Sequence, residues 1–325
     1  MLRNLQPKTP WPLPGWLSCF PEKLRCYSAD DAFIAGWNSF MELHGKGTRL
    51  REQIWNLGSV LLKADCTFRG NGLRGIRFIE QHGFHICAVR ELSFSRRGVE
   101  DLWRYSLGRL SAERLELLQR LQTRCSSLYM LVKSKAHVSR FPSSLQLTEL
   151  KGQADPAIRH SASLRCVMGE PQSTFFNFVH TADEPADLVR EVGLLFGEEE
   201  RRSVILESAL DARPDAEGAY EALQARSETS DLNFSCAVER LSSAVARSVG
   251  LANQERADCL DEVNRLPAAG YASWLKLREK LNLRGVVIRE VDEIIIAAKL
   301  IPLKQAKPQQ IFPSCEARHW ERHDP

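Results

Sequence analysis

A histidine and a glutamate that stand eleven residues apart could carry phosphoryl-transfer chemistry in this chain of 325 residues. His180 follows the run Asn177-Phe178-Val179, and Glu191 lies in an apolar run typical of a helix. An imidazole has an unperturbed pKa of about 6.5, so much of it is unprotonated and nucleophilic near neutral pH. A carboxylate that returned to the ring would orient it. These two residues therefore predict a histidine that accepts a phosphoryl group.

Four upstream segments could build the framework that positions this histidine. Their patterns predict a strand, an amphipathic helix that ends at a glycine before a second strand, a third strand, and a loop. They are Val60–Asp65, Gly75–Ile86, Ser127–Val132 and Leu150–Arg165. Strands that alternate with helices in this way favour an α+β sandwich, with helices over one antiparallel sheet.

Together these motifs resemble the nucleoside diphosphate kinase family over roughly residues 58 to 197. The resemblance rests on the lysine after the first strand, the Asp155-Pro156-Ala157 loop, the Ser163-Leu164-Arg165 triplet and the histidine run. It implies a ferredoxin-like βαββαβ core. It also implies that a nucleoside triphosphate phosphorylates His180, and that the phosphohistidine then passes the group to a diphosphate.

The resemblance places the family's site residues on particular positions of this chain. The catalytic residues would be His180, Glu191 and Lys63, with Glu191 bonded to the other ring nitrogen. The substrate-binding residues would be Lys63, Trp103, Tyr105, Arg165 and Asn177. Lysine and arginine would meet phosphates, asparagine the sugar, and Trp103 or Tyr105 would replace a phosphate-contacting tyrosine. Mg²⁺ would be the cofactor, bound mainly through the nucleotide phosphates, so no metal-ligating residue is expected.

Several departures from the family bear on phosphate and base binding. Ala154 replaces a loop threonine, and Thr148 and its neighbours stand where the family has a second phosphate-contacting arginine. Ala182 replaces a serine that would bond the glutamate. Residues 111–118 are helix-like and lack an aromatic side chain, where the family stacks one on the base. The pocket is therefore expected to hold phosphates better than bases.

The composition is that of an ordinary globular protein, with 43% apolar and 26% charged residues. A net charge of +3 gives no support to nucleic-acid binding. The nine cysteines include no Cys-x-x-Cys pair, and the amino terminus has no continuous apolar run, so we expect a cytoplasmic protein without disulfides or membrane contact. Cys315, His319 and His323 have a spacing that a metal could use on a helix, but a tail is the favoured interpretation.

The chain divides into three expected parts. Residues 1–57 form a Pro/Trp-rich extension with one helix over 29–44, since the early prolines exclude a regular helix. Residues 58–200 form the kinase-like domain. Residues 201–325 form a mostly helical domain that ends in short strands, because Arg284–Ile288 and Glu293–Ile296 are β-branched runs.

Two classes of function are open at this point. The first is a phosphotransferase that acts through His180 on a diphosphate or another acceptor, such as a small metabolite. The alternative is a catalytically degenerate pseudo-kinase that senses nucleotide and serves as an interaction module. Both share a nucleoside triphosphate as ligand, and the flanking regions leave room for a homo-oligomer or a protein partner.

Overall fold

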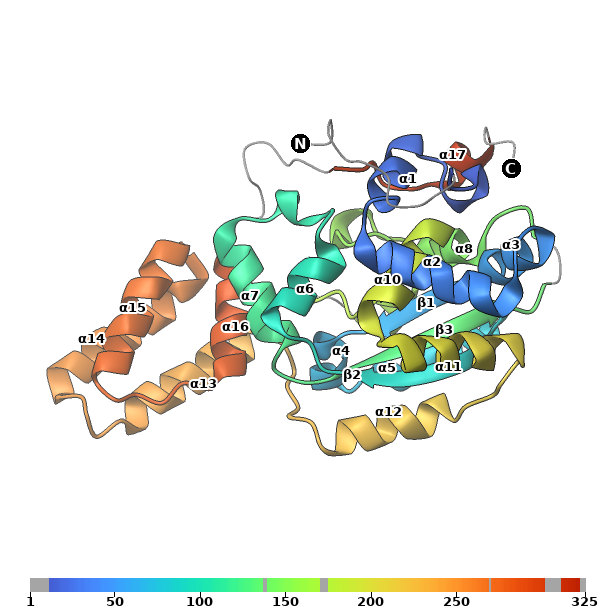
Figure 1. Cartoon of the computed structure of the whole chain (residues 1–325). Coiled ribbons are helices and arrows are strands. Elements are labelled where there is room, and N and C mark those ends of the chain that lie inside the picture. The colour runs from blue at the N-terminus through green and yellow to red at the C-terminus, as the bar shows by residue number, and fades with distance from the viewer. Residues whose placement is uncertain (1–11, 137–138, 170–174, 269, 302–310, 322–325) are drawn as a thin grey trace.

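The centre of the molecule is a four-stranded antiparallel sheet (Figure 1). This computed structural model describes residues 12–136, 139–169, 175–268, 270–301 and 311–321. The strands are β1 (Leu57–Leu62), β2 (Phe84–Leu92), β3 (Ser127–Ser134) and β4 (Val179–Thr181), in the spatial order β2-β3-β1-β4. Helices connect β1 to β2 and β3 to β4. This is the α+β, ferredoxin-like βαββαβ arrangement that the sequence predicts.

The two central strands are buried on both faces, so alternate residues enter different cores. Val60 and Met130 pack into one hydrophobic cluster. Leu61 and Leu131 pack into a second cluster on the opposite face. The pairing of β4 with β1 places His180 opposite Leu61. Because a one-residue slip would reverse every side chain, this burial fixes the register of the histidine strand.

Helices cover both faces of the sheet. The first cluster draws side chains from α4 (Ala64–Arg69), α5 (Gly72–Gln81), α7 (Ala112–Gln122), α8 (Ser143–Lys151) and α9 (Leu164–Val167). The second draws on α6 (Arg96–Trp103), α10 (Pro185–Leu195) and α11 (Glu198–Ala209). Two short 3₁₀ turns, η2 (Leu107–Arg109) and η3 (Pro156–Ile158), lie in the connections.

The amino-terminal extension contains more helix than the sequence predicts. It forms η1 (Gly15–Leu17), α1 (Pro21–Tyr27), α2 (Asp31–His44) and α3 (Thr48–Trp55), where one helix was expected. Pro21 begins α1, a position where a missing N–H costs nothing. Helix α2 packs closely on α10, since a Cβ on Gly36 would lie 2.0 Å from the carbonyl oxygen of Val189. The extension is thus part of the second core.

The segment after the sheet is helical, as predicted. Helices α11 and α12 (Ala216–Ala225) both contact strands β2 and β3. The helices that pack away from the sheet therefore begin after α12 rather than at residue 201. Beyond them, α13 (Phe234–Arg247), α14 (Asn253–Arg265), η4 (Leu266–Ala268), α15 (Tyr271–Leu283) and α16 (Glu290–Leu300) form a group beside α7 (Figure 1). The last helix, α17 (Ala317–Glu321), returns to the amino-terminal extension.

The expected strand pair near the carboxyl terminus is wrong. Residues 293–296 belong to helix α16, and no strand is formed by residues 284–288. Ile294, Ile295 and Ile296 are all buried, against α7 and α13 among others. Burial on several sides suits a helix enclosed by others, and the acidic first turn favours its amino-terminal end. Tertiary packing thus overrides the β-branched preference. Within the described ranges, every helix is too short or too polar to cross a membrane.

Candidate functional site

The structure brings His180 and Glu191 together. His180 lies in β4, and Glu191 lies on α10, the helix that follows this strand. Nε2 of His180 and Oε1 of Glu191 are 2.6 Å apart, and the glutamate is buried. Since an ionised carboxylate only accepts hydrogen bonds, Nε2 is the donor in this contact, and in a neutral imidazole Nδ1 then keeps its lone pair. Nδ1 is therefore the nitrogen available for nucleophilic chemistry.

A serine from the neighbouring strand holds the second oxygen of Glu191. Ser59 Oγ donates to Oε2 at 2.6 Å, and it accepts a hydrogen bond from the backbone N–H of Ala182 at 3.2 Å. Ser59 is itself buried in β1. A carboxylate that is bonded at both oxygens cannot rotate freely, so the orientation of the imidazole is set by β1 as well as α10.

A strained turn leads the backbone into β4. Phe178 has a φ of 63°, in a region that residues other than glycine rarely adopt. Its N–H donates to Oδ2 of Asp65 at 2.7 Å, and its carbonyl accepts from the N–H of Lys63 at 2.9 Å. The junction between β1 and α4 therefore holds the turn at both backbone groups. Strain of this kind persists where the surroundings over-determine it, and it clusters at functional sites.

A cavity of about 270 Å³ lies beside this turn. Five of the residues that the sequence assigns to the site line it, from four parts of the chain. They are Lys63, Trp103, Arg165, Asn177 and His180. These five residues combine two cations, an amide, an indole and an imidazole, which is a donor-rich set suited to an anionic ligand.

Lys63 and Arg165 are both buried and have partners within the protein. Lys63 Nζ lies 3.2 Å from Oδ1 of Asp65, and burial lowers the pKa of Lys63 although the carboxylate opposes this. Arg165 donates to the carbonyls of Gly152 at 2.7 Å and Val179 at 3.0 Å. Burial lowers the pKa of Arg165 to about 10, which leaves the guanidinium charged at neutral pH. A phosphate ligand would have to share these groups.

The side chains of Trp103 and Tyr105 contact different parts of the protein. The Trp103 ring meets the His180 ring edge-on, with centroids 5.7 Å apart. Tyr105 instead donates from its hydroxyl to Oδ2 of Asp30 at 2.8 Å, and it lines a second cavity of about 80 Å³ together with Glu191. Tyr105 is not among the described residues that line the larger cavity. The amino-terminal extension, which the sequence does not place in space, supplies its partner.

The middle of the chain matches a known family model. Residues 58–201 match the model described as nucleoside diphosphate kinase. This segment is a nucleoside diphosphate kinase-like domain. The extensions at both ends lie outside the match, so the chain is larger than that domain. No curated protein matches the chain.

Three solved nucleoside diphosphate kinases are also similar. The one from Encephalitozoon cuniculi is 19% identical, with 44% of this chain and 90% of that chain covered. The one from Pyrobaculum aerophilum is 19% identical and the one from Aquifex aeolicus 18%, each with 45% of this chain and 97% of the other covered. All three have a TM-score of 0.37, and the domain assignment rests on the family model.

Two departures from the family take a definite form in the structure. Ser59 supplies the hydroxyl partner that Ala182 cannot give to Glu191. Thr148, at the place of the family's second arginine, instead joins a polar cluster: its hydroxyl donates to Oδ1 of Asp183 at 2.9 Å, and Lys151 Nζ lies 3.1 Å from the same atom. Neither Thr148 nor Lys151 is among the described residues that line the larger cavity.

The sequence did not reveal three further residues that line this cavity. Arg114 and Leu118, one helical turn apart on α7, face it, and Phe175 lies opposite with its ring centroid 5.9 Å from the Arg114 guanidinium carbon. The run 111–118 does form a helix, as predicted. The signals that could have found these residues are the four-residue spacing on α7 and the Phe175-Phe176 pair just before Asn177.

Proposed function

We propose that this protein transfers the γ-phosphoryl group of a nucleoside triphosphate through a phosphohistidine at His180. The observation that carries the proposal is the 2.6 Å contact between Nε2 of His180 and Glu191, at a cavity that Lys63 and Arg165 line. Because Glu191 holds the ring proton at Nε2, the lone pair of Nδ1 is free to attack phosphorus. Phosphoryl transfer needs mainly positioning and charge, and this cavity offers both.

The chemistry consists of two balanced half-reactions. In the first, Nδ1 of His180 forms a bond to the γ-phosphorus while the bond to the β–γ bridging oxygen breaks, and the electron pair leaves with the nucleoside diphosphate. The ring keeps its proton on Nε2 and becomes cationic, and Glu191 stabilises this charge. In the second, a terminal oxygen of a diphosphate or another acceptor attacks the same phosphorus. The N–P bond then breaks and returns its electrons to the ring.

Residues from three parts of the chain would hold the nucleotide. Lys63 after β1 and Arg165 on α9 would supply positive charge for the phosphates, and Asn177, which lines the same cavity, would bind the sugar. None of the described residues that line the cavity is a carboxylate, so the donor set fits Mg²⁺ carried on phosphate oxygens rather than on the chain. When bound in that way, Mg²⁺ neutralises phosphate charge.

The base would meet a different surface from that of the family. Residues 111–118 lack the aromatic side chain on which the family stacks the base. Arg114, Leu118 and Phe175 line the cavity instead. The Arg114 guanidinium lies over the Phe175 ring, so a base would have to displace it to reach the π-face. Aromatic faces stack on every base. The proposal is therefore a base-tolerant donor site, with the acceptor a diphosphate or another phosphoryl acceptor.

A nucleotide-binding module without turnover is the second candidate. It is favoured by the contacts of the two cations, since Lys63 is paired with Asp65 and Arg165 donates to backbone carbonyls. Cations that keep their contacts within the protein could bind a triphosphate but would not move to stabilise the negative charge that develops on the γ-phosphoryl group during transfer. The pseudo-kinase would then act as a nucleotide sensor or a partner-binding module.

Steady-state transfer assays distinguish the two candidates. The purified chain is incubated with ATP, Mg²⁺ and each of the common nucleoside diphosphates, and the new triphosphates are measured. Transfer that disappears in His180→Gln, while ATP affinity measured by calorimetry persists, supports the phosphotransferase. ATP binding without transfer to any diphosphate supports the binding module unless a phosphoenzyme forms, in which case the acceptor is another molecule.

A further inference from the structure

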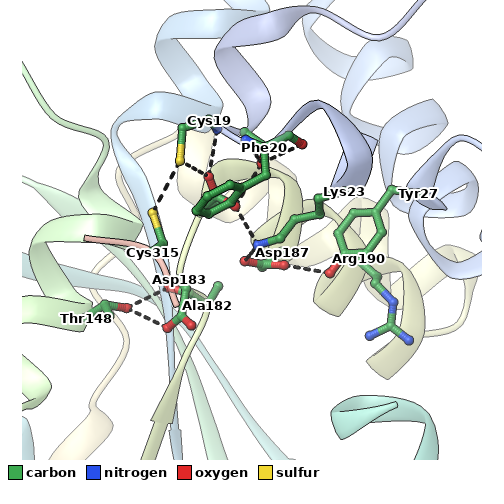
Figure 2. Close-up of polar contacts among 12 residues, drawn as sticks. Cys19, Phe20, Lys23, Tyr27, Thr148, Ala182, Asp183, Asp187, Arg190 and Cys315 are labelled. Carbon is green, nitrogen blue, oxygen red and sulfur yellow. Dashed lines mark hydrogen bonds and ion pairs between the residues drawn. The ribbon is translucent and has the colours of Figure 1, made fainter. Parts of the chain in front are cut away.

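Two cysteines from opposite ends of the chain meet at the start of α10. Cys19 lies between η1 and α1, and Cys315 lies just before α17. Their sulfur atoms are 3.8 Å apart, and Figure 2 shows them directed toward each other. Cys19 Sγ is also 3.1 Å from Oε1 of Glu184, the residue that precedes α10. One ligand atom from each of the three residues lies within 4.8 Å of the others.

The spacing of these atoms matches a metal centre better than a disulfide. Two thiolates bound at about 2.3 Å to one tetrahedral zinc ion lie about 3.8 Å apart. The sulfur atoms of a disulfide are only about 2.0 Å apart, so the cysteines would have to move much closer. Glu184 adds a carboxylate oxygen, a ligand that zinc accepts beside sulfur. The same oxygen is already oriented by the backbone N–H of Cys19, at 2.8 Å.

We propose that Cys19, Cys315 and Glu184 bind a zinc ion. Three protein ligands leave the fourth tetrahedral position for water, and the partial exposure of Cys19 gives a route to it. From the sequence alone, the partners considered for Cys315 are His319 and His323, with a tail as the favoured interpretation. His323 lies outside the described residues, and the groups that approach Cys315 Sγ are Cys19 and the indole N–H of Trp320.

A dication would offset most of the ligand charge at this place. Two thiols lose their protons to solvent, and two thiolates and one carboxylate then face one Zn²⁺. Lys23 offsets part of the remaining negative charge: its Nζ lies 2.5 Å from Oε2, the other oxygen of Glu184, and is shared with Asp187 at 2.9 Å. Trp320 donates to Cys315 Sγ at 3.1 Å, an outer contact that suits a thiolate acceptor.

A bound ion would join residues 19 and 315, and so fasten both ends of the described chain onto α10, the helix that carries Glu191.

Cobalt substitution of the full chain tests the site. The protein is purified in a phosphine reductant, stripped with a chelator and titrated with Co²⁺. One equivalent should give thiolate-to-cobalt charge-transfer absorption, and Zn²⁺ should displace it. Cys19→Ser and Cys315→Ser should each lose the absorption, whereas Cys236→Ser, a half-buried thiol on α13, should keep it. Circular dichroism confirms that each variant is folded.

A second measurement on the wild-type chain covers the case in which a variant does not fold. Zinc should protect Cys19 and Cys315, but not Cys236, from alkylation mapped by mass spectrometry. The proposal is overturned if cobalt gives no thiolate absorption, if the absorption survives in folded Cys19→Ser, or if zinc leaves both cysteines open to alkylation. A Cys19–Cys315 disulfide that persists in the reductant would overturn it as well.

Discussion

The carboxylate of Asp65 accepts a hydrogen bond from the backbone N–H of Phe178, 2.7 Å away. This contact joins the first turn of α4, just after β1, to the turn that precedes His180. The other carboxylate oxygen of Asp65, Oδ1, lies 3.2 Å from Nζ of Lys63 and compensates the charge of the lysine. One carboxylate thus supports the strained φ of Phe178 and holds the lysine that the proposal assigns to phosphate.

Replacing Asp65 by asparagine should separate these two roles. The asparagine side chain could still accept the Phe178 hydrogen bond, but Lys63 would lose its buried counter-charge. We expect the free energy of unfolding to fall by about 3 kcal/mol. Added ATP should then raise the melting temperature more in the variant than in the wild type, because phosphate gives the lysine a new anionic partner.

The matched control is Asp261→Asn, which breaks an exposed ion pair with Arg265 and should change stability by less than about 1 kcal/mol. An ATP-induced thermal shift no larger in Asp65→Asn than in the wild type would remove Lys63 from the phosphate site.

Glu191→Gln tests the charge that faces the imidazole. Glutamine can still accept from Nε2 of His180, but it cannot stabilise the cationic phosphohistidine as a carboxylate does. A charge-assisted hydrogen bond is worth about 1.5–3 kcal/mol, so kcat for transfer should fall roughly 10- to 100-fold. KM for ATP should change little, because Glu191 lines the second cavity and not the larger one. Glu199→Gln, an exposed site on α11, should leave both constants unchanged. A rise in KM alone would contradict this role.

Phe175 is the expected stacking platform for the base. Phe175→Ala should weaken the binding of ATP, GTP, CTP and UTP by a similar amount, about 1–3 kcal/mol each by calorimetry. Phe175→Leu, which keeps an apolar side chain but has no π-face, should recover little of the loss. In the wild type, the four triphosphates should bind within a few-fold of one another. A preference of tenfold or more for one base would instead indicate dedicated hydrogen bonds, for which Arg114 is the nearest candidate.

An ion pair between Asp30 and Arg190 predicts an acid-sensitive attachment of the extension. Arg190 Nε lies 2.9 Å from Oδ2 of Asp30, and both side chains are buried. Burial alone would raise the pKa of Asp30, but Arg190 and the hydrogen bonds from Arg190 and Tyr105 lower it below its ordinary value of 3.8. A depressed carboxyl pKa stabilises the fold above the unfolded-state value, and this contribution is lost as the pH falls through the folded-state pKa.

Asp30→Asn should therefore lower the free energy of unfolding at neutral pH by about 3–5 kcal/mol, since Arg190 stays buried without its counter-charge. The variant should also lose less stability than the wild type between pH 4 and more acidic values, as measured by chemical denaturation. Asp258→Asn, an exposed position on α14, serves as the control. If the free energy of unfolding falls equally with pH in the wild type and in Asp30→Asn, the Asp30–Arg190 pair does not cause the acid sensitivity.

Local patterns were enough to predict the framework of the site. The apolar runs Val60–Leu62 and Ser127–Val132 predict strands because continuous apolar residues suit a doubly covered sheet. The order of elements then brings Lys63 and His180 near each other, since β1 pairs with β4. The helix at 293–296 was missed because burial among other helices, which no local pattern encodes, decides the conformation of its isoleucines.

Contacts between distant parts of the chain could not be predicted from the sequence. Ser59 meets Glu191 across 132 positions, and Tyr105 is turned toward Asp30 by an extension whose docking depends on tertiary packing. Phe175 enters the cavity from a loop, where no periodicity predicts the direction of a side chain. Each of these residues lies in an ordinary local pattern, so only the three-dimensional arrangement reveals its part in the site.

The most direct test of the account is covalent labelling of the enzyme. The full chain is incubated with γ-labelled ATP and Mg²⁺, freed of nucleotide, and examined for label that is stable in base and labile in acid. The account predicts label that maps to His180, is absent from His180→Gln, and is discharged by an added acceptor. Wild-type protein that binds ATP yet carries no such label, or carries it on another residue, would contradict a phosphohistidine at His180.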